Sequence, residues 1–295
     1  MQLLRKTLVV TVLSVAAAAC AALPTTEKVK SFGDAAASSS SAMKNALNAD
    51  RLVAVRKSTE REAKAYVTGK AYRLVMTAEE ESNLLKADDQ VAVLSALDAY
   101  AKALVKAADK GVIDDLETAS VNLGTAAASL GAAAVPTAAP IVGPAFKLTG
   151  RLLGLGLGNA YAAEIQSVIR ATDPTVQVIA TNMPKSLDPI ALVIQEEVNR
   201  YEFERQNLLN AIRRDKKVDR LQLYKEYLVA RNDVVVMQQQ AISIRKSSGI
   251  FNKLGKAHKA LADGSPDAAA LVADFAAASA ELAELIKAVR TVSGG

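Results

Sequence analysis

The sequence contains one histidine and one cysteine, and these two side chains limit the chemistry that it could perform. His258 lies in the stretch KLGKAHKAL, where the flanking lysines predict an exposed position on a helix. A carboxylate-bridged metal centre in a helical bundle requires Glu-x-x-His on each of two helices. One histidine cannot supply that set, and the residue three positions before it is Gly255. We therefore expect no metal site and no cofactor.

The acidic residues form short clusters that favour helix capping over catalysis. These clusters lie at 79–81, 88–89, 114–115 and 196–197. Adjacent side chains on a helix point about 100° apart, so neighbouring carboxylates do not face one substrate. Three of the clusters begin predicted helices, where negative charge complements the helix dipole. A glycosidase would need a facing pair of carboxylates, and usually aromatic platforms for the sugar, but only 4% of the residues are aromatic. The sequence predicts a protein that is not an enzyme.

The first twenty residues have the organisation of an export signal. Arg5 and Lys6 precede a short apolar run at 7–15, and small residues lead from there to Cys20. The run is too short for a spanning helix, which needs about 20 apolar residues. An exported protein that used cysteine structurally would usually carry pairs, so the single Cys20 suggests another role.

This region resembles a bacterial lipoprotein signal peptide, whose lipobox ends in a lipidated cysteine. The commonest lipobox has Leu three positions before the cysteine, where this sequence has Ala17. The resemblance implies a signal peptide at 1–19, lipidation of Cys20 and a tether at 20–28. It also implies stable membrane anchoring and, with Ala21 next, an outer-membrane protein facing the periplasm or the cell surface. The alternative is cleavage near Ala21 or Ala22, which would give a soluble periplasmic or secreted protein.

Apolar residues in the rest of the chain recur at helical spacing. Intervals of three and four residues occur at 93–107, 113–130 and 271–292, and alanine, the best helix former, is abundant. The longest run comprises Leu223, Tyr227, Ala230, Val234, Met237, Ala241 and Ile244. Such heptads pack helices at shallow angles. We predict an all-α, elongated antiparallel bundle of many helices with coiled-coil-like packing, forming a single domain at 29–295.

Proline, glycine and capping residues predict where the helices end. The first expected helix covers 29–75, with Gly33 and Gly69 as weak points, and a capping box at 77–80 restarts the helix. Further helices are expected at 88–111, 113–134 and 145–172, followed by a short helix that ends at 183. The last ones are expected at 186–214, from there to 246 with a kinked continuation to 263, and at 268–292. The breaks near 172 and 184 rest on prolines, which remove an amide donor and disfavour helix before them, and SLDP at 186–189 is expected to open the next helix. The charged stretch RRDKKVD at 213–219 is read as a tight hairpin, with one continuous helix as the alternative.

A segment rich in Pro, Gly and Ala predicts an elbow at 131–158 between two helices. It belongs to a charge-free run at 118–146 that holds few large apolar residues, so we do not expect a spanning helix. Gly150, Gly154 and Gly158 share one helix face, which permits close approach of another helix. With Leu152 and Leu155 they are the candidate packing interface.

Basic residues gather at 200–263, where fourteen Lys or Arg oppose seven Asp or Glu. Basic segments contact nucleic acid or anionic surfaces, and an exported protein rarely meets nucleic acid, so we expect no nucleic-acid partner. The candidate contacts with an anionic envelope surface are Arg213, Arg214, Lys216 and Lys217. The alternative is an ordinary solvated helix face.

These features predict a non-enzymatic, lipid-anchored protein of the cell envelope that acts as a helical interaction or structural module. Its partners would be the membrane, through Cys20, and an unidentified envelope protein or a second copy. One alternative is a membrane-active protein, because the layout resembles cytolysin A-type pore formers in architecture alone. Another is a carrier of an apolar ligand in a groove lined by Leu152, Leu153, Leu155 and Leu157.

Overall fold

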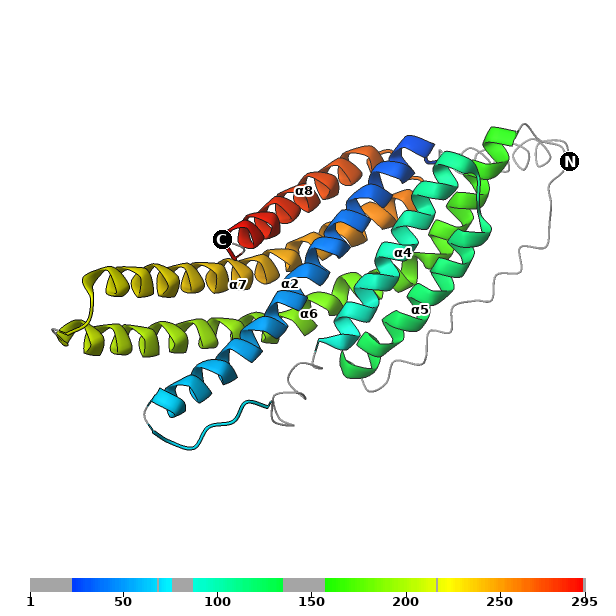
Figure 1. The fold of residues 1–295 in the computed structure, drawn as a ribbon. Helices are drawn as coiled ribbons and strands as arrows, with labels where there is room; N and C mark the ends of the chain where they lie inside the picture. The colour runs from blue at the N-terminus through cyan, green and yellow to red at the C-terminus, as the bar shows by residue number, and fades with distance from the viewer. Residues whose placement is uncertain (1–22, 68, 76–86, 135–156, 216, 294–295) are drawn as a thin grey trace, which may run out of the picture.

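The computed structural model describes residues 23–67, 69–75, 87–134, 157–215 and 217–293, and within these ranges the regular structure is helical, with no strand. The helices are α2 (Thr26–Val67), α4 (Asp88–Lys110), α5 (Asp114–Ala134), α6 (Leu157–Arg214), α7 (Arg220–Asp263) and α8 (Ala268–Ser293). They lie along one long axis and form an elongated bundle (Figure 1). The prediction of an all-α antiparallel bundle is confirmed.

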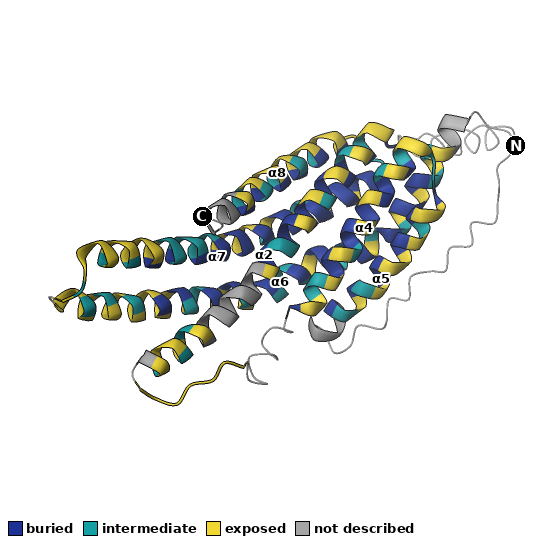
Figure 2. Cartoon of the chain, in the orientation of Figure 1, coloured by how far each residue is buried: buried dark blue, intermediate teal, exposed yellow. Residues whose placement is uncertain are grey.

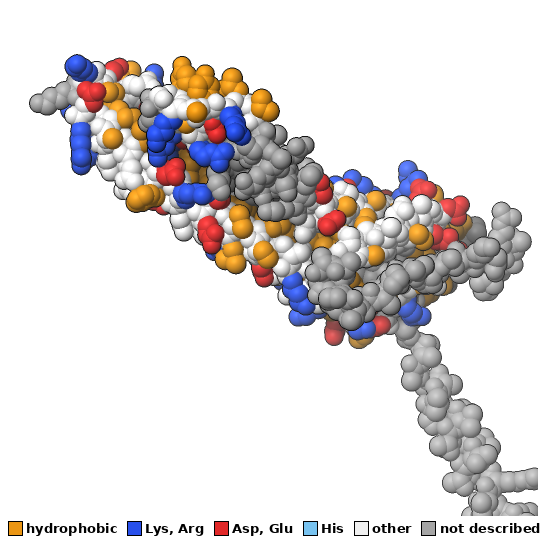
Figure 3. All heavy atoms as spheres, turned by 90° about the horizontal axis from the view of Figure 1, so that it is seen from below, with side chains coloured by type: hydrophobic (Ala, Val, Ile, Leu, Met, Phe, Trp, Pro, Cys, Tyr) orange, Lys and Arg blue, Asp and Glu red, His pale blue; other side chains and the backbone are white. Residues whose placement is uncertain are grey.

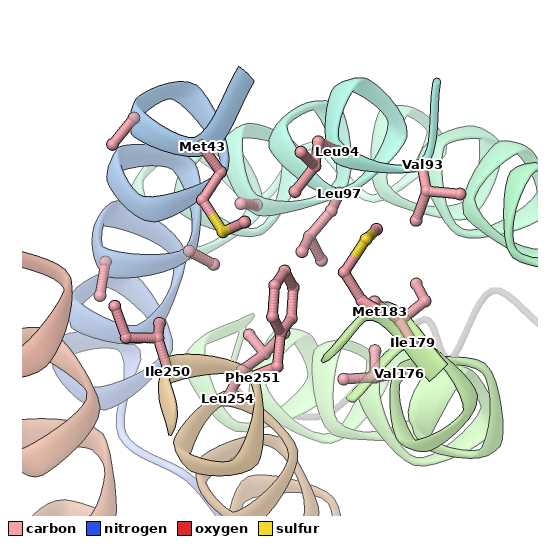
Figure 4. Packing of buried hydrophobic residues seen from close by; sticks show 14 of the residues in the cluster. Met43, Val93, Leu94, Leu97, Val176, Ile179, Met183, Ile250, Phe251 and Leu254 are labelled. Carbon is pink, nitrogen blue, oxygen red and sulfur yellow. The ribbon is translucent and has the colours of Figure 1, made fainter. Parts of the chain in front are cut away.

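The helices pack in pairs around one buried apolar core. α6 and α7 share the most extensive contact, α2 packs on α4 and α8, and α5 covers α4 and α6. Side chains from α2, α4, α6 and α7 converge around Phe251 in the centre of the bundle (Figure 4). Buried residues line the facing sides of the helices, and exposed ones line their outer sides (Figure 2).

Several helix ends lie where the capping residues predict them. Gly111 follows α4 with a φ of 68° and donates its N–H to Ala107 O, which is the left-handed cap that glycine favours. Asp219 begins α7 by accepting from the N–H of Leu221. Because α6 ends at Arg214 and α7 begins at Arg220, the preferred hairpin at 213–219 is present.

The predicted breaks in the middle of the chain are wrong, because α6 runs without interruption through Pro174, Pro184 and Pro189. A proline inside a helix costs about 3 kcal/mol. A continuous buried face opposes that cost, since burying each large apolar side chain contributes about 1.5–3 kcal/mol. This face comprises Val176, Ile179, Met183, Leu187, Ala191, Ile194 and Val198. α7 likewise joins the two predicted segments before and after residue 246 in one helix.

α2 differs from its prediction at its C-terminal end and at Gly33. It ends at Val67 rather than near 75, and Gly69 follows with a φ of 68°. Gly33, expected to weaken the helix, instead lies where α2 and α4 approach closely. A Cβ there would lie 2.7 Å from Val105 Cγ2 and 2.8 Å from the carbonyl oxygen of Ala101.

The α6–α7 hairpin extends beyond the bundle as a two-helix projection, here called the arm and comprising residues 202–231 (Figure 1). The N-terminus of α2 lies at the opposite end of the molecule (Figure 1). Across the described ranges, no helix combines the length and the apolar character that crossing a bilayer requires.

Candidate interaction site

The arm carries a groove of about 620 Å³ between its two helices, here called the arm groove. The α6 side is lined by Glu202, Arg205, Gln206, Leu209, Asn210 and Arg213. The α7 side is lined by Arg220, Leu223, Tyr224, Tyr227, Ala230, Arg231 and Val234. These residues recur at intervals of three and four along each helix, so the groove follows the seam where the two helices face each other.

The arm groove is the exposed continuation of the heptad that packs the bundle. Within the bundle, Val234 and Met237 are 6% and 3% exposed. Farther out on the same seam, Tyr227 is 56% exposed and Leu223 is half-buried. Two helices alone cannot enclose a seam that elsewhere in the molecule is covered by further helices. The pattern of an apolar face thus extends into solvent without an intramolecular cover among the described residues.

Four arginines and one glutamate make the arm groove strongly basic. Arg213, Arg220 and Arg231 are exposed, and no carboxylate of the described chain lies within ion-pair distance of them. Basic side chains lie beside hydrophobic ones at this end of the molecule (Figure 3). The groove therefore combines free guanidinium groups with exposed tyrosine rings, the two side-chain types that most often dominate protein interfaces.

A polar cluster fixes the base of the arm to α2. Arg205 donates from Nη2 to Oε1 of Glu60 at 2.5 Å and from Nε to the hydroxyl of Tyr201 at 3.2 Å. The Tyr201 hydroxyl donates to Oδ2 of Asp233 at 2.6 Å. Burial, with this donation to Asp233, raises the pKa of Tyr201 to about 12. α2, α6 and α7 are therefore joined where the arm leaves the bundle.

The predicted basic contacts lie at the tip of the arm. Arg213 and Arg214 end α6, and Lys217 lies in the turn, where its N–H donates to Oδ1 of Asp215 at 2.9 Å. All three side chains are exposed, as expected, and Lys216 lies outside the described residues. Arg213 also lines the arm groove, a placement that the charge count alone did not predict.

Most of the other predicted site residues lie outside the described chain. These are Cys20, Gly150, Leu152, Leu153, Gly154 and Leu155, whereas Leu157 and Gly158 lie in the first turn of α6. The capping box at 77–80 and most of the elbow at 131–158 also lie outside it.

His258 is buried, so its predicted surface position is wrong. Its ring is 0% exposed, with Nε2 2.9 Å from the hydroxyl of Tyr100 and Nδ1 2.9 Å from Oδ1 of Asp173. The flanking lysines lie on other faces of α7. The informative neighbours are Leu254 and Leu261, four positions before and three after, which place position 258 on the core face.

The contacts of His258 belong to a closed hydrogen-bonded cluster. Oδ1 of Asp173 also accepts from Nε2 of Gln177 at 2.9 Å. Burial alone would raise the pKa of Asp173, but the hydrogen bonds from His258 and Gln177 lower it. A carboxylate can only accept, so the imidazole donates from Nδ1, and a neutral ring accepts at Nε2 from Tyr100. Burial raises the pKa of Tyr100 well above its ordinary value, which keeps the donating hydroxyl protonated.

This cluster has the residue types of a nucleophile–base–acid relay, but its tyrosine and histidine are enclosed by the core. Tyr100 is 0% exposed, and Phe32 lies against the histidine with 5.5 Å between the ring centres. The arm groove is lined by other residues. Within the described ranges, no group of three His, Asp or Glu side chains is arranged to hold a metal ion. The cluster therefore joins helices, and the arm groove is the candidate site.

Comparisons with protein-family models, with curated proteins and with solved structures find no match to this chain. Its own geometry is accordingly the basis for any functional proposal.

Proposed function

We propose that this chain is a non-enzymatic, lipid-anchored protein of the cell envelope whose arm binds another protein. The observation that carries the proposal is the open end of the heptad seam. An apolar face that is buried at Val234 and Met237 continues to Leu223 and Tyr227, where it meets solvent. Beside it lie three arginines that have no ion-pair partner among the described residues. Exposed apolar surface rimmed by polar residues is characteristic of interaction sites.

The N-terminal end of α2 lies far from the arm, which supports an orientation in which the arm points away from the proposed lipid anchor. α2 begins at Thr26, six positions after Cys20, and this end of the bundle is the one remote from the arm (Figure 1). α7 has 44 residues, so it spans about 66 Å at 1.5 Å per residue. If Cys20 carries the lipid, the arm reaches well beyond the membrane surface toward a partner.

The enclosed cluster around His258 supports a structural role for the acid–base residues of this chain. Tyr100, His258 and Asp173 satisfy one another by hydrogen bonds in the core. A catalytic base must be within reach of the proton that it removes from a substrate. Side chains that bond to each other across α4, α6 and α7 instead fix how these helices pack.

Two measurements on cells test the proposal. Cys20→Ser should move the protein from the membrane fraction to the soluble fraction, and unchanged fractionation would exclude the lipid anchor. A photo-crosslinking amino acid at position 224 should capture a specific envelope protein in intact cells. The same group at position 256, which is exposed on the bundle part of α7, is the matched control. Identical products from both positions, or none, would contradict a binding role for the arm.

A further inference from the structure

We propose that the arm groove binds a single amphipathic α-helix of a partner protein, with acidic residues flanking its apolar face. This inference rests on the proposed binding role of the arm and specifies the chemistry of its partner.

The shape of the groove fits a third helix. Leu209 on α6 and Leu223 and Tyr227 on α7 provide apolar surface between the two helices. Two-stranded seams of this kind accept a further helix when knobs from its apolar face enter the exposed positions. The α7 lining extends from Arg220 to Val234, which corresponds to roughly 20 Å along the axis, or about four helical turns.

The charges of the groove select an acidic helix. Arg213 and Arg220 lie at the tip, and Arg231 lies toward the bundle, so cations flank the apolar surface at both ends. Guanidinium groups form bidentate hydrogen bonds with carboxylates, which makes the planar fork of arginine suited to Glu and Asp. The one acidic lining residue, Glu202, leaves this set of cations largely uncompensated.

Charge and position disfavour two other occupants. A second copy of the arm would bring the same arginines together, and juxtaposed like charges oppose association. A lipid surface would contact the convex outer sides of the arm more readily than a groove between two helices. An amphipathic helix with acidic flanks would both cover the apolar surface of the groove and pair with its arginines.

Binding of designed helical probes to the purified protein tests this inference. The probe is a fluorescein-labelled peptide of roughly 18 residues with a Leu/Ala apolar face and Glu flanks. The control peptide has the same apolar face and Lys flanks. Fluorescence anisotropy should show binding of the acidic peptide and at least about tenfold weaker binding of the basic one, a difference of about 1.4 kcal/mol.

Charge reversal at the groove should invert this preference. The double variant Arg213→Glu/Arg220→Glu should weaken binding of the acidic peptide at least about tenfold and strengthen that of the basic peptide. Lys256→Glu, an exposed change on the bundle part of α7, should leave both affinities unchanged. Since all three positions are exposed, the variants should retain the helical circular dichroism of the parent protein.

Equal binding of the two peptides, or acidic-peptide binding that survives the double reversal, would overturn the inference. So would a failure of the acidic peptide to bind while phosphatidylglycerol vesicles bind through Arg213 and Arg220. Self-association that the double variant removes would assign the groove to a second copy. If position 224 still crosslinks to an envelope protein but the acidic peptide does not bind, the proposed function stands and this inference fails. If neither occurs, both fail.

Discussion

The hydroxyl of Tyr100 lies 2.9 Å from Nε2 of His258, and this contact joins α4 to α7 across 158 positions of sequence. Through Nδ1, the same imidazole reaches Asp173 on α6. One ring therefore links three helices, and both of its nitrogens have partners. Because both Tyr100 and His258 are inaccessible to solvent, neither partner can be replaced by water without repacking.

Replacing His258 should destabilise the bundle, and removing its partner should restore part of the loss. His258→Leu removes the nitrogen that accepts from the buried Tyr100 hydroxyl and the N–H that donates to Asp173, which we expect to lower the free energy of unfolding by about 2–4 kcal/mol. Tyr100→Phe in the same chain removes the hydroxyl that has lost its acceptor on His258, so the double variant should be more stable than the sum of the single effects predicts. Urea unfolding followed by circular dichroism measures all four proteins. Strict additivity would show that the two side chains do not interact.

Asp173 should contribute stability that is lost in acid. The pKa of its carboxyl is lowered in the folded protein from 3.8, so folding is favoured while the carboxylate is charged. This contribution is fully present above pH 3.8 and declines as the pH falls through the lower, folded value. Asp173→Asn should therefore flatten the dependence of unfolding free energy on pH below about 4. A variant with the slope of the parent protein in this window would argue against the stabilising hydrogen bonds that Asp173 accepts from His258 and Gln177.

Two positions on the α7 seam should differ sharply in their effect on stability. Met237→Ala creates a cavity in the bundle and should cost about 2–5 kcal/mol. Tyr227→Ala removes a ring that is 56% exposed, and it should cost less than about 1 kcal/mol. Thermal and urea unfolding provide the comparison. A large loss at Tyr227 would mean that the seam of the arm is covered in the isolated protein.

Alanine should have opposite effects at two helical glycines. A Cβ at Gly33 would meet the backbone oxygen of Ala101 at 2.8 Å, and relieving such a clash should cost about 1–3 kcal/mol. At Gly249 on α7, a Cβ would meet nothing within 4 Å. Gly249→Ala should therefore stabilise the protein by about 0.5–1 kcal/mol through helix propensity. Equal effects at both positions would contradict the close approach of α2 and α4.

Local signals explain which parts of the fold could be predicted from the sequence. The ends of α4 and α7 depend on Gly111, Asp219 and Gly264, whose capping geometry is a property of a few adjacent residues. The continuity of α6 depends on burial against other helices, so prolines alone gave the wrong boundaries. The packing that offsets the cost of a proline involves residues distant in sequence, so it cannot be recognised from the residues around the proline.

The candidate site was predicted only in part, because local patterns identified some of its residues but not how the helices surround them. The charge count identified Arg213 as exposed, and the heptad identified Leu223 and Tyr227 as apolar seam positions. Neither pattern states how many helices surround the seam at a given level, so the groove was not predicted. His258 was misplaced because its lysine neighbours in sequence are not its neighbours on the helix face.

The passage of α6 and α7 from bundle to arm has a consequence for cooperativity. One continuous helix, α7, crosses from a closely packed interior at Met237 to an open seam at Tyr227. Backbone amides in the outer turns near Tyr227 should open without unfolding the interior near Met237. Hydrogen exchange along α7 should therefore be fast in the outer turns and fall in a step where the helix enters the bundle. A ligand that closes the seam would move that step outward, because the outer turns would then exchange only after the ligand dissociates.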